Sequence, residues 1–328
     1  MKINKILITS VIFFELSVVL ILAVKIYRKI NIFGSVSVNP INNKFVSKNE
    51  ESTLQYFYEF LPNTTIKDKL PPLRIETKDT INSDGLNETI NYSVSKPKNT
   101  FRIITIGDSY TYGLYINAKD NWTKKLEILL NKNANCRNIK RFEVMNLGVP
   151  GYDIEYSIER FRLKGEKYNP DLVLFFLKND DFEYINEYIL PKEKQIRRQM
   201  NLYPDDPNYY YKDGIKYPTW DRAGSILRDE IGEKQILEYQ LKSLKKMNNY
   251  YNRKLFVFTF HSTNTKYKNI IGEFSHSRKD IFFYDNLVDI YKLNYFLYPD
   301  PHPSQEGHKA IAEDLFKQLV KDNIIPCK

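Results

Sequence analysis

The chain has 328 residues, of which 42% are hydrophobic and 27% are charged, and its formal net charge is +9. This length supports a full hydrophobic core but no more than about two domains. The positive charge is spread along the chain, which argues against a nucleic-acid reader and predicts a generally basic surface. The two cysteines, Cys136 and Cys327, have no histidines near them at metal-ligand spacing, so a structural zinc site is excluded. A disulfide between them and two free thiols both remain open.

The first element in chain order is an apolar segment from Ile6 to Val24, with lysines on both flanks. At helical rise its 19 residues span roughly 28 Å, close to the thickness of the hydrocarbon core of a bilayer. We therefore expect residues 1–27 to form an uncleaved transmembrane anchor. A cleaved signal peptide is the alternative, but the apolar run is longer than a usual signal core and no small-residue cleavage pattern follows it.

Residues 28–100 are polar and rich in turn signals, including Pro71-Pro72 and Asn82-Ser83-Asp84-Gly85. Such a stretch predicts a tether followed by a few short strands that pack on the main domain. The pattern changes at Phe101, and residues 101–328 read as one principal domain.

Short apolar runs and helical stripes alternate through this domain. The runs are rich in β-branched and aromatic residues: Ile103 to Ile106, Glu143 to Asn146, Leu172 to Leu177, Leu255 to Phe260 and Ile281 to Tyr284. Between or after them, apolar residues recur at spacings of three and four: Trp122, Leu126 and Leu129; Ile154, Ile158 and Phe161; Leu237, Leu241 and Leu244; Ile311, Leu315 and Leu319. This alternation predicts an α/β fold, a three-layer α/β/α sandwich around a five-stranded parallel sheet.

One charged, tyrosine-rich and proline-punctuated region, at about residues 182–229, breaks the alternation. We interpret it as an insertion between the third strand and the helix that follows. Insertions at the carboxyl ends of parallel strands commonly shape a substrate cleft.

A candidate nucleophile follows the first strand, in the sequence Gly107-Asp108-Ser109. A serine after a buried strand, with a glycine that permits a tight turn, lies at the sheet edge where ligands bind. By itself Gly-Asp-Ser is a common turn. It is also not the Gly-x-Ser-x-Gly elbow of α/β-hydrolases, which occurs nowhere in the chain.

Three further blocks follow in order. They are Asn146-Leu147-Gly148-Val149-Pro150-Gly151 after the second strand, Lys178-Asn179-Asp180-Asp181 after the third, and Asp300-Pro301-His302 before the last helix. Together with the serine block they resemble the sequence blocks of the SGNH (GDSL-like) hydrolases, and the resemblance extends from Phe101 to the end of the chain. Upstream sequence around Tyr58 to Thr64 and Ile81 to Leu86 resembles the leader of bacterial membrane-anchored members.

The resemblance implies a serine esterase that needs no metal or organic cofactor. Ser109 would be the nucleophile and His302 the general base, oriented by Asp300. The backbone N–H groups of Ser109 and Gly151 and the side chain of Asn179 would form the oxyanion hole. These residue types suit the chemistry because a serine hydroxyl needs an imidazole to accept its proton, and the oxyanion needs preorganised donors.

Several assignments have alternatives. Gly148 competes with Gly151 for the oxyanion role, and Asn179 could simply cap a helix or turn. Many SGNH relatives have the aspartate three positions before the histidine, where this chain has Pro299, so Asp300 fits the shorter spacing. Lys178 stands where glycine is frequent; it could narrow the cleft, bind an anionic substrate or point to solvent.

Of the other histidines, His308 is expected to be structural, His261 could line the cleft or pack in the interior, and His276 has no argued role. The expected substrate is an O-acyl ester of a glycan or lipid. Acyl transfer to an envelope polysaccharide is the close alternative, and a catalytically inactive surface-anchored binding or assembly protein is the alternative from another class. Because basic residues flank the predicted anchor on both sides, they set no firm orientation. The resemblance to anchored envelope enzymes favours a cell-membrane protein with its domain outside the cytoplasm.

Overall fold

The computed structural model describes residues 45–47, 51–70, 73–199, 202–203, 206–212, 215–288, 294–298 and 300–327. The predicted membrane anchor, residues 1–27, lies outside these ranges. Within them, no helix is both long and apolar enough to cross a bilayer.

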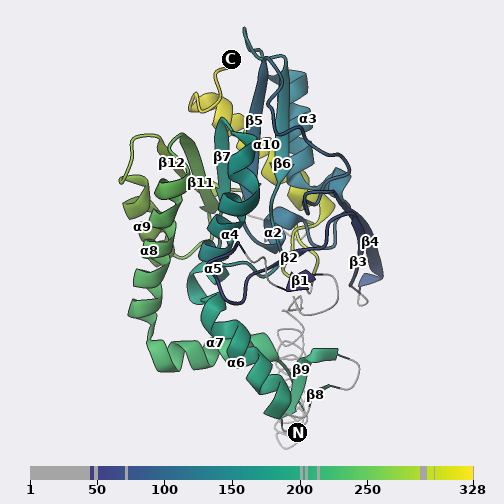
Figure 1. Cartoon of the computed structure of the whole chain (residues 1–328), viewed down its shortest axis with the longest axis vertical. Helices are drawn as coiled ribbons and strands as arrows, with labels where there is room; N and C mark the ends of the chain where they lie inside the picture. The colour runs from purple at the N-terminus through teal and green to yellow at the C-terminus, as the bar shows by residue number, and fades with distance from the viewer. Residues whose placement is uncertain are drawn as a thin grey trace, which may run out of the picture.

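A five-stranded parallel sheet forms the centre of the molecule (Figure 1). Its strands are β5 (Thr100–Ile106), β6 (Arg141–Asn146), β7 (Leu172–Phe176), β11 (Lys254–Phe260) and β12 (Ile281–Leu287). In space they follow the order β12, β11, β7, β5, β6, and every neighbouring pair is parallel. The prediction of a five-stranded parallel sheet is confirmed.

The two faces of this sheet are covered by different helices. Along β7, Leu172, Leu174 and Phe176 belong to the hydrophobic core shared with α3 (Trp122–Asn133) and α10 (Gln305–Lys321). Val173 and Phe175 alternate with them and belong to the core on the other face. That second core is shared with α4 (Ile154–Arg160), α8 (Glu233–Tyr250) and α9 (Thr265–Ser275). Strand side chains point alternately to the two faces, so a strand buried on both sides reads as a continuous apolar run.

The buried stripe of α3 differs by one residue from the predicted stripe. Trp122, Leu126 and Leu130 are fully buried, whereas Leu129 only packs against the edge of the core. Two successive steps of four keep Leu130 on the same face as Trp122, while Leu129 sits beside it. The predicted stripes of α4 and α10 are buried as expected, through Ile154 and Ile158 and through the set Ile311, Leu315 and Leu319.

Several short helical turns complete the α/β unit. These are α2 (Ser109–Tyr112), η2 (Ala118–Asp120), η3 (Phe161–Gly165), η4 (Glu166–Tyr168) and α5 (Asn179–Glu183).

Two small antiparallel pairs precede the sheet. Strand β1 (Phe45–Ser47) pairs with β2 (Tyr58–Phe60), and β3 (Thr64–Leu70) pairs with β4 (Ile75–Ile81). Phe57, Phe60 and Ile66 from this segment share a hydrophobic cluster with Tyr112 of α2 and Tyr156 of α4. The segment upstream of residue 100 therefore packs directly against the helix that begins with Ser109.

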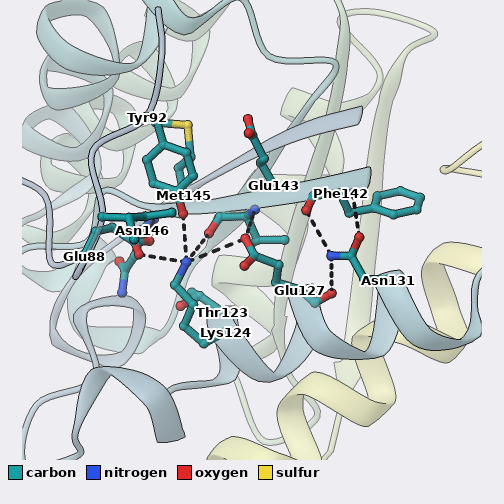
Figure 2. A network of polar contacts seen from close by, with 12 residues as sticks. Glu88, Tyr92, Thr123, Lys124, Glu127, Asn131, Phe142, Glu143, Met145 and Asn146 are labelled. Carbon is teal, nitrogen blue, oxygen red and sulfur yellow. Dashed lines mark hydrogen bonds and ion pairs between the residues drawn. The ribbon is translucent and has the colours of Figure 1, made fainter. Parts of the chain in front are cut away.

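A polar network adds a second attachment of this segment to the sheet (Figure 2). The Lys124 ammonium lies 2.7 Å from a carboxylate oxygen of Glu88 and donates to the Tyr92 hydroxyl (2.8 Å). The other oxygen of Glu88 accepts the backbone N–H of Asn146 at the end of β6 (3.0 Å). The Asn146 side chain in turn donates to the carbonyl of Thr111 in α2 (2.9 Å). Buried polar groups linked in this way hold the upstream segment, β6 and α2 in one arrangement.

The region between α5 and α8 carries its own elements. They are α6 (Asn186–Gln199), β8 (Leu202–Tyr203), β9 (Asp206–Lys212), β10 (Ile215–Pro218) and α7 (Thr219–Ile231). Helices α6 and α7 pack on each other through Ile189, Ala223 and Leu227. In Figure 1 this unit extends from one end of the sheet, beyond α5.

A disulfide links Cys136 and Cys327, whose Cα atoms are 4.5 Å apart. It joins the segment after α3 to the segment after α10. The pattern of the sequence left this pairing open because the two cysteines are 191 positions apart.

Candidate active site

Ser109 is the first residue of α2, and Gly107 and Asp108 separate it from the end of β5. Gly107 has a φ of +147°, and a Cβ there would lie 2.4 Å from the Thr111 hydroxyl oxygen and 2.9 Å from the Phe176 carbonyl oxygen. Only glycine fits this turn. The Asp108 carboxylate caps the helix by accepting the Tyr110 N–H (2.9 Å). This tight strand-to-helix turn places Ser109 at the carboxyl edge of the sheet, in the wall of a cavity.

His302 and Asp300 reach the same place from the segment before α10. The Nε2 atom of His302 lies 2.8 Å from the hydroxyl oxygen of Ser109, and its Nδ1 lies 2.6 Å from a carboxylate oxygen of Asp300. The same Asp300 oxygen accepts the backbone N–H of His302 (2.9 Å). Asp300 is 1% exposed. The shorter spacing of aspartate and histidine thus still allows the side chains to form a continuous Ser109–His302–Asp300 chain.

The His302 ring is held in place on several sides. The rings of Tyr110 and Tyr115 pack against it, with centroids 5.1 and 5.7 Å away. The Tyr110 hydroxyl also donates to the carbonyl of Pro301 (2.7 Å). Because Tyr110 directly follows Ser109, one residue fixes both the serine turn and the histidine segment.

Of the two glycines that competed for the oxyanion role, Gly151 is the one that lines the cavity. The Gly148 N–H instead donates to the side chain of Asn146 (2.9 Å). Gly151 has a φ of +79°, and its carbonyl accepts a hydrogen bond from the Asn186 side chain (2.8 Å). The loop after β6 is therefore tied to the start of α6.

Asn179 is not among the residues that line the cavity, although Lys178, Asp180 and Asp181 beside it are. Its side-chain oxygen accepts the backbone N–H of Asn264 at the start of α9 (3.0 Å). The structure thus brings Ser109, Gly151, His302 and Asp300 together, while the Asn179 side chain contacts α9.

Lys178 lies within the site and does not point to solvent. Its ammonium is 2.9 Å from the Asp108 carboxylate and 2.7 Å from that of Asp180, and it lies over the Tyr110 ring. Burial would lower the pKa of Lys178, but Asp108 and Asp180 outweigh this effect and hold its pKa well above the ordinary value. The lysine is therefore charged and already paired with two carboxylates.

The remaining histidines lie away from the cavity. His308 is fully buried in α10, where its Nδ1 accepts the Trp122 N–H (3.2 Å), and burial lowers its pKa to about 3. It is a neutral structural residue. His261 is exposed and its Nδ1 lies 2.7 Å from the Asn286 side-chain oxygen. His276 follows α9 as its carboxyl-terminal cap.

Part of the cavity wall was not identified from the sequence. Tyr184, Asn186, Trp220 and Asp221 line the same cavity as Ser109 and come from the region around α6 and α7. The sequence indicated these residues only in general terms, through the tyrosine-rich insertion predicted after the third strand. Among the described residues, no group of three or more His, Cys, Asp or Glu side chains is arranged to hold a metal ion.

A parallel α/β sheet with serine, histidine and aspartate joined at its carboxyl edge has the arrangement of a serine hydrolase. The chain belongs to the GDSL-like lipase/acylhydrolase family, whose family model matches residues 103–315. This confirms the family-level resemblance to the SGNH hydrolases.

Solved structures with detectable similarity are distant. A lipolytic protein of the G-D-S-L family from Desulfitobacterium hafniense DCB-2 shares 18% identity over 66% of this chain and 98% of its own, with a TM-score of 0.36. An acetyl xylan esterase from Butyrivibrio proteoclasticus shares 14% identity over 68% of this chain and 64% of its own, with a TM-score of 0.40. A family 3 carbohydrate esterase from Clostridium thermocellum shares 14% identity over 68% of this chain and 96% of its own, with a TM-score of 0.39. No curated protein sequence matches the chain significantly.

Proposed function

We propose that this protein is a serine esterase that cleaves an O-acyl ester of a glycan or lipid through an acyl-serine intermediate. The observation that carries the proposal is the Ser109–His302–Asp300 chain, with contacts of 2.8 and 2.6 Å, open to the cavity. Ser109 is the nucleophile, His302 the general base and Asp300 the group that orients the imidazole.

In the first half-reaction His302 Nε2 accepts the Ser109 hydroxyl proton while the serine oxygen attacks the acyl carbon. The Asp300 carboxylate, hydrogen-bonded to His302 Nδ1, stabilises the imidazolium that forms. The tetrahedral intermediate then collapses, and the alcohol leaves with the proton held on Nε2. In the second half-reaction His302 takes a proton from water, the resulting hydroxide attacks the acyl-serine, and Ser109 regains its proton as the acid is released.

The oxyanion of each intermediate needs several donors. The backbone N–H groups of Ser109 and Gly151 are proposed to supply two, because both residues line the cavity. The Asn179 side chain is the proposed third. Its oxygen already accepts a bond from Asn264, so this role depends on the amide NH₂.

Fluorophosphonate labelling tests this proposal directly, since the reagent reacts with an activated serine. The wild-type protein should be labelled and should hydrolyse p-nitrophenyl acetate, whereas Ser109→Ala and His302→Ala should lose at least about 1,000-fold in kcat. Circular dichroism should show that both variants are folded. An unlabelled wild-type protein would favour the inactive binding or assembly protein. Faster release of the acyl group onto a sugar acceptor than onto water would favour the acyltransferase.

The location is a further part of the proposal. Residues 1–27 are proposed to anchor the protein in the cell membrane, with residues 28–328 outside the cytoplasm. The Cys136–Cys327 disulfide supports a location outside the cytoplasm, because disulfides persist mainly in oxidising compartments. Protease added to intact spheroplasts should digest the domain. Protection until lysis would place it in the cytoplasm.

A further inference from the structure

The cavity beside Ser109 has a wall that does not belong to the five-stranded α/β unit. Tyr184 follows α5, and Trp220 and Asp221 lie in the first turn of α7. All three line the same cavity as Ser109 and His302. A molecule that extends from the serine along this cavity can therefore contact the wall.

Two aromatic rings form the wall. The rings of Tyr184 and Trp220 have centroids 5.9 Å apart at an interplanar angle of 69°, and both side chains are half-buried. Gly224 lies one turn after Trp220, and a Cβ there would be 2.4 Å from the Tyr184 ring. The absence of a side chain at Gly224 lets Tyr184 lie directly on α7. The pair is thus fixed before any ligand binds, which lowers the entropic cost of binding.

The polar part of the lining is acidic. Five aspartates line the cavity: Asp108, Asp153, Asp180, Asp181 and Asp221. Lys178 is the one lysine or arginine among the described lining residues, and Asp108 and Asp180 already pair with it. Burial raises the pKa of Asp153 to about 7 and that of Asp181 well above its ordinary value, so these two carry less negative charge. The lining still has more carboxylates than cations.

This combination selects among ligand classes. An acyl chain offers no hydrogen-bond donor to these carboxylates and would displace the water around them, which costs free energy. An anionic ligand would meet like charges. A neutral sugar suits both parts, since its C–H face packs on aromatic rings and its hydroxyls donate hydrogen bonds to carboxylates.

We infer that Trp220 and Tyr184 bind the ring of a neutral sugar that carries the scissile ester, with Asp221 accepting hydrogen bonds from its hydroxyls. This inference rests on the proposed esterase function. It assigns substrate choice to the inserted region and the chemistry to the α/β unit.

The test compares kcat/KM for esters with and without a sugar. The probes are p-nitrophenyl acetate, acetylated xylo-, manno- and gluco-oligosaccharides, acetylated oligogalacturonate as the anionic sugar, and p-nitrophenyl palmitate as the lipid-like ester. Trp220→Ala should lower kcat/KM on the preferred neutral sugar ester, mainly through KM, by a factor at least about tenfold larger than its effect on p-nitrophenyl acetate. Trp220→Phe should retain most of the activity.

Tyr188→Ala is the matched control, because Tyr188 is an aromatic residue of α6 that packs between α6 and α7 without lining the cavity. It should leave both rates within about twofold of wild type. Equal losses on all esters in Trp220→Ala, or preference of the wild type for the anionic or the palmitoyl ester, would overturn the inference. So would hydrolysis of p-nitrophenyl acetate without any neutral sugar ester. Failure of the esterase proposal looks different, since neither labelling nor p-nitrophenyl acetate hydrolysis would then be observed.

Discussion

The ammonium group of Lys178 lies 2.9 Å from the carboxylate of Asp108, the residue directly before Ser109. Both side chains are largely buried, with 12% and 8% of their surfaces exposed. Asp108 also caps α2, and one of its oxygens lies 3.3 Å from the Ser109 hydroxyl oxygen. The charge of Lys178 therefore stabilises the Asp108 carboxylate in the turn that holds Ser109, the proposed nucleophile.

Lys178→Met should destabilise the protein by about 3 kcal/mol, because it leaves the buried Asp108 carboxylate without this cation. It should also lower kcat, since an unpaired Asp108 competes with His302 for the Ser109 proton. Adding Asp108→Asn, which keeps the capping oxygen, should restore at least half of the lost stability. Urea unfolding of the two single variants and the double variant measures the coupling. Strictly additive effects would show that the ion pair contributes nothing.

Gly151→Ala should lower kcat on p-nitrophenyl acetate about 100-fold, the size of effect expected when one oxyanion donor is displaced. Its backbone has a φ of +79°, and a Cβ would lie 2.9 Å from the Tyr58 hydroxyl oxygen, so the peptide must shift. Gly272→Ala is the control, because nothing lies within 4 Å of a Cβ at that position in α9. It should keep full activity. Comparable activity of the two variants would exclude Gly151 from the oxyanion hole.

Asn179→Asp separates the two possible roles of that side chain. Aspartate keeps an oxygen for the Asn264 N–H but has no NH₂ donor. If the amide serves the oxyanion, kcat should fall about 100-fold while the unfolding midpoint stays close to that of wild type. Asn179→Ala should lose both activity and stability. A fully active Asn179→Asp variant would limit the residue to holding the start of α9.

The lowered pKa of His308 predicts that the stability of the folded protein depends on pH. Its pKa is lowered from 6.5 to about 3 in the folded protein, so only the unfolded chain binds its proton between those values. Its contribution to stability is therefore complete above pH 6.5 and is lost as the pH falls toward 3, by about 1.4 kcal/mol for each unit. His308→Asn keeps an acceptor for the Trp122 N–H but does not titrate. The stability advantage of wild type over this variant should shrink on acidification, and parallel pH curves would contradict the prediction.

Much of the fold could be predicted because its signals are local. The apolar runs around Ile103, Val173 and Val257 mark strands buried on both faces, and the spacing of Ile311, Leu315 and Leu319 marks one face of a helix. The order of strands and helices then restricts the topology to a parallel sheet. The exact buried face of a helix was predicted less accurately, as with Leu129 and Leu130 of α3, since neighbouring positions on a helix differ by only part of a turn.

The sequence by itself determined the layered α/β architecture, the turn at Gly107 and the family blocks that contain Ser109 and His302. Each of these depends on contacts between residues close in the chain or on a short motif. Only the tertiary structure decided that Lys178 pairs with Asp108, that Asn179 contacts α9, that Cys136 bonds Cys327 and that Trp220 lines the cavity. These contacts join segments far apart in sequence or depend on which way one side chain turns, and local periodicity carries no information about either.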